Sequence, residues 1–323
     1  MLVVSLAVCL NLLLGDLWAK YQPRFLLMKL VRALEINLFV EGERKPVRDF
    51  AGGLFLVLLV GYLVYEITGR VAGALTLIAN DFVRLFVESL LLALLLGLRN
   101  LRDIVASIYL LLEAKRLEEA GAVASLFAIR ELEDLTPVEI ISLTLITLAK
   151  RLITFVIAPL FFYLLGGLEL AYLYTAVKAA DLLLGYKIER YYYFGKATAS
   201  IDMALNFVPA RLSGICIVLA AALLGLNYQN AMRTIGDEAT TTSSKTLGQA
   251  VAGYAGALGL RLGGRYRFLG VILEDSAVGR DLETMEPMHL VAAIRLTTAA
   301  TLCFLLLAYL FQLALEINLF SAG

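Results

Sequence analysis

The stretch that decides the fold is VEIISLTLITLAKRLITFVIAPLFFYLL, residues Val138–Leu165, with LELAYLYTAVKAADLLL, residues Leu168–Leu184, close behind it. A helix needs about 20 predominantly apolar residues to cross the hydrocarbon core of a bilayer. The two runs approach or exceed that length, and they predict two membrane-spanning helices. Further candidate spans are Leu2–Leu14, Ala51–Ile67, Leu85–Leu98, Phe207–Leu226 and Leu290–Leu315.

The composition points the same way. Hydrophobic residues make up 60% of the chain and charged residues 17%, with a mean hydropathy of +0.82. A soluble domain has about 25% charged and 45–50% apolar residues. We therefore predict an all-α fold, a polytopic integral membrane helical bundle of about five to eight transmembrane or re-entrant helices. It would form a single membrane domain over residues 1–323, with the lipid bilayer of the cell (plasma) membrane as its partner in a multi-pass arrangement.

Charge and reactive residues exclude several classes of function. The 28 basic residues balance the 28 acidic ones, so there is no basic excess for nucleic acid. The three cysteines, Cys9, Cys216 and Cys303, lie in apolar runs and fit small buried hydrophobic residues. His289 is the single histidine, which argues against a histidine-based metal site or a Ser-His-Asp triad.

Polar segments separate the apolar runs, and we predict them as loops 20–50, 99–137, 185–206 and 227–289. The first three are basic, which predicts a cytoplasmic location by the positive-inside rule. Arg99–Pro137 also has apolar residues at helical spacing, which predicts an amphipathic helix on the membrane surface or against a partner helix. Leu247–Leu262 is short and rich in small residues, and could re-enter the membrane under cover of protein.

Two adjacent cations, Lys150 and Arg151, lie in the middle of the run Val138–Leu165. A charge near the centre of a membrane helix costs about 2.5–3.5 kcal/mol on insertion scales. Either the helix breaks there and both side chains reach an interface, or they line an anion-binding cavity. Arg211 stands at the start of the run Phe207–Leu226, where it could hold phosphate or simply extend to the interface.

Several ordered segments in the second half of the chain resemble the motifs of one known family. The segments are APLFFYLLGG at 158–167, YTAVKAAD at 174–181, GYKIERY at 185–191, Asp202, Asn206 with VPARLS at 208–213, and AGALGLRLGG at 255–264. They are similar, in the same order, to the motifs APLFF…GG, YKAVNTLDSMVGYKxEKY, MDDxxNYxPARLS and AGALGxQLGG. On these segments the chain is identified as a member of the CbiB/CobD family of cobalamin-biosynthesis membrane proteins.

The resemblance implies a membrane-bound adenosylcobinamide-phosphate synthase. Such an enzyme joins adenosylcobyric acid, a corrinoid, to aminopropanol phosphate or a related amino alcohol by an ATP-dependent amide ligation, with Mg²⁺ and ATP as cofactors. This chemistry needs cations or metal-holding carboxylates near phosphate, and a general base for the amine. The candidate residues are, for catalysis, Asp181, Asp202, Lys187 and Glu189; for substrate or phosphate binding, Arg211, Asn206, Lys150, Arg151, Lys178 and Lys245; and for metal binding, Asp16, Asp181 and Asp202.

Each carboxylate also has a purely structural interpretation. Asp181 lies near a membrane boundary, where it could hold Mg²⁺ or form a salt bridge with Lys178 or Lys187. Asp202 and Asn206 are four residues apart and share one helix face, so they could bind a metal or hydrogen-bond each other.

The sequence departs from the family motifs mainly at polar positions. Lys178 stands at the asparagine of the second motif, and Met203 at the second aspartate of the third. Lys150 and Arg151 stand where the family has an acidic ENTxDG segment, and Lys245 lies in a segment that differs from HxSPN. Two hypotheses follow. The chain is a divergent enzyme whose cations bind phosphates, or it is a catalytically degenerate paralogue acting as a non-enzymatic membrane binding, scaffold or regulatory protein. A homo-oligomer is compatible with both.

Overall fold

The computed structural model describes residues 1–15, 22–38, 45–132, 136–185, 192–241, 244, 246–268 and 271–321. Their contacts form two units. The first unit consists of Leu2–Gly97 and Ala158–Phe207, and the second mainly of Leu98–Ile157 and Val208–Gly323. Each unit therefore joins segments that are far apart in the sequence. The expected single membrane domain is not tested by this grouping and stays a prediction.

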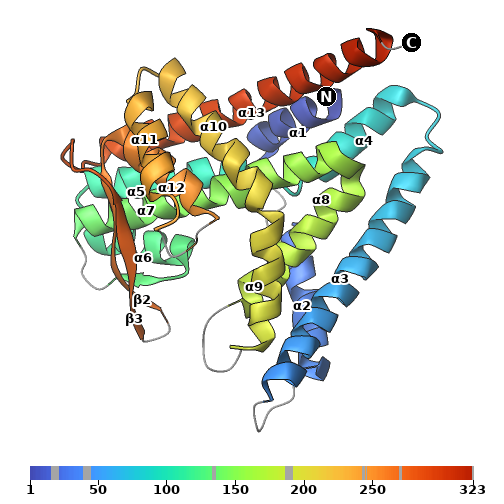
Figure 1. Ribbon diagram of the computed structural model, residues 1–323, viewed down its shortest axis with the longest axis horizontal. Helices are drawn as coiled ribbons and strands as arrows, with labels where there is room; N and C mark the ends of the chain where they lie inside the picture. The colour runs from blue at the N-terminus through green and yellow to red at the C-terminus, as the bar shows by residue number, and fades with distance from the viewer. Residues whose placement is uncertain are drawn as a thin grey trace. The chain divides into compact units, whose positions relative to one another are not determined.

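All regular elements described in the first unit are helices (Figure 1). They are α1 (Leu2–Leu14), α2 (Pro23–Leu38), α3 (Pro46–Leu75), α4 (Asp81–Ala93), α8 (Ala158–Leu184) and α9 (Phe194–Leu205). Helices α3, α8 and α9 pack against one another, and α2 packs on both α3 and α8. Helix α1 packs on α4, which also contacts α8. This arrangement makes α8 the central helix of the unit.

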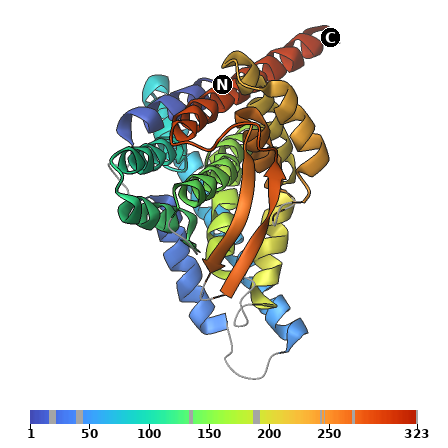
Figure 2. The same ribbon diagram turned by 90° about the vertical axis from the view of Figure 1, so that its left-hand side faces the viewer.

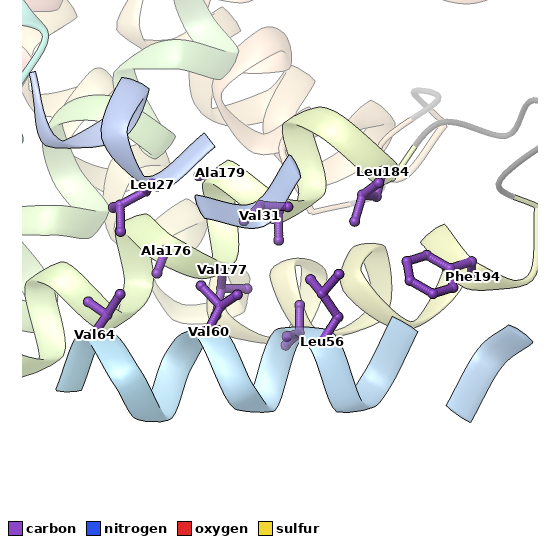
Figure 3. Packing of buried hydrophobic residues seen from close by; sticks show 12 residues of the cluster. Leu27, Val31, Leu56, Val60, Val64, Ala176, Val177, Ala179, Leu184 and Phe194 are labelled. Atoms are coloured by element: carbon purple, nitrogen blue, oxygen red, sulfur yellow. The ribbon is translucent and has the colours of Figure 1, made fainter. Parts of the chain in front are cut away.

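The core of the first unit is built from α2, α3, α8 and α9 (Figure 3). Its members are Leu27, Val31, Leu56, Val57, Val60, Val64, Ala176, Val177, Ala179, Ala180, Leu184 and Phe194. The alanines on α8 let the neighbouring helices come close, as small residues do in membrane helix pairs. Gly53 on α3 marks the tightest approach to α9, because a Cβ atom there would overlap the backbone carbonyl of Phe194. Beside this core, α8 also carries the polar side chains Lys178 and Asp181, and Lys178 contacts α9.

The second unit combines helices with a small sheet. Its elements are α5 (Leu98–Glu113), α6 (Leu117–Ala128), β1 (Glu131–Leu132), α7 (Pro137–Leu152), the π-helical turn η2 (Ile153–Ile157), α10 (Phe207–Leu223), α11 (Tyr228–Glu238), α12 (Gly248–Leu258), β2 (Arg261–Phe268), β3 (Val271–Gly279) and α13 (Met288–Ser321). Helix α7 contacts α5, α6, α12 and α13. Helix α5 buries one apolar face, including Leu101, Val105 and Ile108, which confirms the amphipathic helix predicted in Arg99–Pro137.

An antiparallel hairpin of β2 and β3 interrupts the helices of the second unit (Figure 2). The short strand β1 adds to β2, giving the order β1-β2-β3. The register of the hairpin is irregular between Leu262 and Gly264, and both Gly263 and Gly264 have a positive φ, which glycine adopts readily. Helix α12 ends at Gly259, whose left-handed conformation turns the chain into β2. Leu247–Leu262, proposed above as re-entrant, is thus an 11-residue helix that leads into a strand.

Three helical runs in the described parts of the chain are long and apolar enough to cross a membrane, namely Pro46–Leu75, Pro137–Leu184 and Met288–Glu316. Helices α9 and α10 meet the same criterion only if they form one bent span, which makes a fourth. Helix α1 is apolar but shorter. The predicted helical bundle is confirmed, and its described residues include these three or four candidate spans by length and composition.

At two places the helices differ in extent from the spans expected from the sequence. The expected span Leu85–Leu98 is helical only as far as Ala93, in the 13-residue helix α4, which is about 20 Å long and shorter than a bilayer core. The two runs that open the sequence analysis belong to the single run Pro137–Leu184. Within α8, however, Gly166 and Gly167 leave the helical conformation, and Gly167 has a φ of 70° that favours glycine.

Candidate functional site

The polar face of α8 forms the base of the candidate site in the first unit. Tyr174, Lys178 and Asp181 follow one another at spacings of four and three residues, which places their side chains on one face of the helix. The core residues Val177, Ala180 and Leu184 lie on the neighbouring side of the same helix. One helix therefore carries both the packing that fixes its position and the polar groups of the site.

Lys178 joins two carboxylates that belong to different helices. Its ammonium donates hydrogen bonds of 2.9 Å to Asp181 Oδ2 on α8 and of 2.9 Å to Asp202 Oδ2 on α9. The side chains of Lys178 and Asp202 are only 9% and 10% exposed, and that of Asp181 is 18% exposed. Buried charges are costly unless they are paired, so these contacts account for the burial of three charged groups. Asp181 is the more accessible of the two carboxylates.

The network continues from Asp202 through neutral groups. Asn206 donates from Nδ2 to Asp202 Oδ1 at 3.0 Å and also to the Asp202 carbonyl at 2.9 Å. Its Oδ1 accepts a hydrogen bond of 2.9 Å from the hydroxyl of Tyr174. The ring of Tyr174 is stacked on Phe162, with centroids 5.0 Å apart. Hydrogen bonds thus run in one line from Tyr174 through Asn206, Asp202 and Lys178 to Asp181.

The end of α8 leaves little free space around Asp181. The Gly185 amide donates to the Asp181 carbonyl at 2.7 Å. A Cβ atom on Gly185 would overlap both the carboxylate and the carbonyl of Asp181. On the following helix, a Cβ atom on Gly195 would overlap the carbonyl of Leu184. Gly185 therefore leaves room for the Asp181 carboxylate, and Gly195 lets α9 approach the end of α8 closely.

Four of the candidate residues predicted from the sequence meet in this cluster: Lys178, Asp181, Asp202 and Asn206. The salt bridge of Asp181 with Lys178 and the hydrogen bond between Asp202 and Asn206 were the structural alternatives to metal binding, and both are present. Tyr174 also belongs to the cluster, although it was not among the candidate residues predicted from the sequence. Its position four residues before Lys178 on the same helix was the signal in the sequence that could have included it.

Lys150, Arg151 and Arg211 belong to the second unit. The helix does not break at Lys150, because α7 continues to Leu152 and passes directly into η2. The guanidinium of Arg151 lies 4.5 Å from the ring centroid of Phe127 and 5.4 Å from that of Phe155. These are cation–π distances, so in the described structure Arg151 packs on two aromatic rings.

Arg211 lies exposed on α10. The remaining candidates, Asp16, Lys187, Glu189 and Lys245, lie outside the described residues. Within the described residues, no group of three or more His, Cys, Asp or Glu side chains is arranged to hold a metal ion. Among the described candidate residues, the charges that lie together are those of Lys178, Asp181 and Asp202.

Comparison with known proteins assigns the chain to a family. Residues 4–297 match the CobD/Cbib protein family. The chain belongs to the CobD/CbiB family. It is 33% identical to "Cobalamin biosynthesis protein CobD" of Geobacter metallireducens, over 98% of both chains. It is 30% identical to the protein of the same name from Streptococcus sanguinis, again over 98% of both chains. No solved structure matches. The family named from the sequence motifs is therefore confirmed.

Proposed function

We propose that this member of the CobD/CbiB family acts in cobalamin biosynthesis as an adenosylcobinamide-phosphate synthase-like ligase. It would join the carboxyl group of adenosylcobyric acid to the amine of aminopropanol phosphate, with ATP as the source of energy. Family membership and the names of the relatives support the pathway. The observation that carries the reaction is the buried cluster, in which Asp181 and Asp202 are both held by Lys178.

The reaction defines what the cluster has to do. As the C–N bond forms, one oxygen of the carboxyl group leaves with the phosphoryl group of ATP, and the ammonium of the amino alcohol gives up two protons. A positioned general base speeds such a step by about 10²–10⁴-fold. We assign the base to Asp181, because its side chain is more exposed than that of Asp202. Asp202 and Asn206 orient Lys178, which in turn orients Asp181 through the hydrogen bond of 2.9 Å.

The fit of this cluster to Mg²⁺ can be judged from its geometry. The point on which Asp181 and Asp202 converge is taken by the ammonium of Lys178, at 2.9 Å from an oxygen of each. Mg²⁺ needs carboxylate oxygens at about 2.0–2.1 Å and no competing cation between them. The residues therefore do not fit a metal at this point, and we derive no step through one. Arg211 is proposed to bind phosphate, because it lies exposed on α10.

The cellular setting follows from the same proposal. The apolar helices suit a multi-pass protein, and we propose the plasma membrane as its location. The corrinoid would be its small-molecule partner. We also propose that the protein forms a homo-oligomer.

The test is turnover by the purified protein in detergent with adenosylcobyric acid, aminopropanol phosphate, ATP and Mg²⁺. We expect adenosylcobinamide phosphate to form, and the rate to fall at least 100-fold in Asp181→Asn. Asp103→Asn is the matched control, because it removes an exposed carboxylate on α5 that pairs with Arg99. Corrinoid binding without turnover would instead favour the degenerate paralogue. Neither binding nor turnover by folded protein would overturn the cobalamin assignment.

A further inference from the structure

The Lys178 ammonium stands at the point where a cation bound by Asp181 and Asp202 would sit. Both carboxylates direct an Oδ2 atom to Nζ at the same distance of 2.9 Å. An ammonium group has three N–H donors, and two of them are used here. Two carboxylates from different helices that converge on one point are a common way to hold a divalent cation. In this chain a side chain already supplies the cation.

A metal ion and this ammonium cannot share the position. A divalent cation between the two carboxylates would lie within contact distance of Nζ, where like charges in a buried site repel strongly. To make room, Lys178 would have to leave a site in which its side chain is only 9% exposed. It would then remain a buried charge without its two partners, which is costly. The bound lysine therefore excludes the metal.

The sequence gives the same indication. Lys178 stands at the asparagine of the family motif that this part of α8 resembles. With an asparagine at this position, no cationic side chain would lie between Asp181 and Asp202. We propose that Lys178 is the permanent counter-cation of the cluster, and that Asp181 and Asp202 of this protein work without a divalent metal between them. Any Mg²⁺ that turnover needs would then enter with ATP.

This inference rests on the proposed function only for the catalytic role of Asp181. Its test is therefore a measurement of metal binding. Purified protein in detergent is titrated with Mn²⁺ in the absence of ATP, and bound Mn²⁺ is counted by electron paramagnetic resonance. The variants are Lys178→Asn, the double variant Lys178→Asn/Asp202→Asn, and Asp202→Asn alone. Lys196→Asn is the matched control, because it removes an exposed lysine from α9.

We expect the wild-type protein, Asp202→Asn and Lys196→Asn to bind the same amount of Mn²⁺. Lys178→Asn should gain one Mn²⁺ site per chain, at least tenfold tighter than any in the wild type, and the double variant should lose it. A wild-type site that disappears in Asp202→Asn would overturn the inference, and so would folded Lys178→Asn that gains no site. If Lys178→Asn does not fold, the comparison of wild type with Asp202→Asn decides the question. A failed turnover assay would leave these results unaffected.

Discussion

Nζ of Lys178 lies 2.9 Å from Oδ2 of Asp202, which is 24 residues farther along the chain and on a different helix. This bond ties α8 to α9 across a connection in which residues 186–191 are outside the described structure. Because the same ammonium also binds Asp181, one side chain neutralises part of the charge of both carboxylates. We therefore expect the stability of the first unit to depend strongly on Lys178.

Replacing Lys178 by Met should therefore destabilise the protein strongly. Met fills a similar volume but leaves two buried carboxylates without a counter-ion, and breaking a buried pair in this way costs about 3–5 kcal/mol. We expect a clear fall in the midpoint of thermal unfolding in detergent, measured by circular dichroism. Lys196→Met, an exposed change on α9, should leave the midpoint within error. An equal midpoint for Lys178→Met and wild type would show that the ion pair is dispensable.

The Tyr174 hydroxyl is the neutral end of the network and can be removed alone. Tyr174→Phe keeps the ring on Phe162 but leaves Asn206 Oδ1 without the donor that now lies at 2.9 Å. An unsatisfied buried acceptor costs about 1–3 kcal/mol. Chemical denaturation should show a loss of this size, and turnover should fall less than in Asp181→Asn. Tyr192→Phe, at an exposed tyrosine, is the control, and a loss as large there would argue against the assigned role of the hydroxyl.

The helical framework could be predicted from the sequence because apolar length is a property of the chain itself. Helix α7 begins at Pro137, one residue before the expected start at Val138, and α8 ends at the expected Leu184. The hairpin Arg261–Gly279 could not be predicted in the same way. Its strands are stabilised by pairing with each other and with β1, a contact distant in sequence, and it follows directly after a helix rich in small residues.

In the candidate site, too, local contacts could be predicted from the sequence and contacts between distant segments could not. The hydrogen bond of Asn206 with Asp202 could be predicted, because a spacing of four places two side chains on one helix face. The contact of Lys178 with Asp202 could not, because it depends on how α8 and α9 pack. Arg151 combines both cases. Phe155 lies four residues after Arg151 on the same helical run, so this contact could be predicted from the spacing, whereas the contact with Phe127 depends on how α6 and α7 pack.

Close packing of α3 against α9 predicts opposite effects at two glycines of one helix. Gly53→Ala should destabilise the protein by about 1–3 kcal/mol, because the new methyl group would overlap the Phe194 carbonyl and force the helices apart. Gly73→Ala on the same helix meets no atom within 4 Å, and should be neutral or stabilise by about 0.5–1 kcal/mol through helix propensity. Unfolding midpoints in detergent compare the two directly. Similar midpoints for both variants would contradict the close approach of α3 and α9.

Arg151 distinguishes a structural cation from a phosphate ligand. Its guanidinium lies over Phe127 and Phe155, and such contacts contribute about 0.5–2 kcal/mol. We expect Arg151→Met to lower the unfolding midpoint while the KM for ATP and for aminopropanol phosphate stays within twofold of wild type. Arg151→Lys keeps the charge but stacks less well on aromatic rings. Its unfolding midpoint should therefore lie between those of Arg151→Met and the wild type. A KM at least tenfold higher in Arg151→Met and restored in Arg151→Lys would instead identify a phosphate-binding residue, because only the charge would then matter.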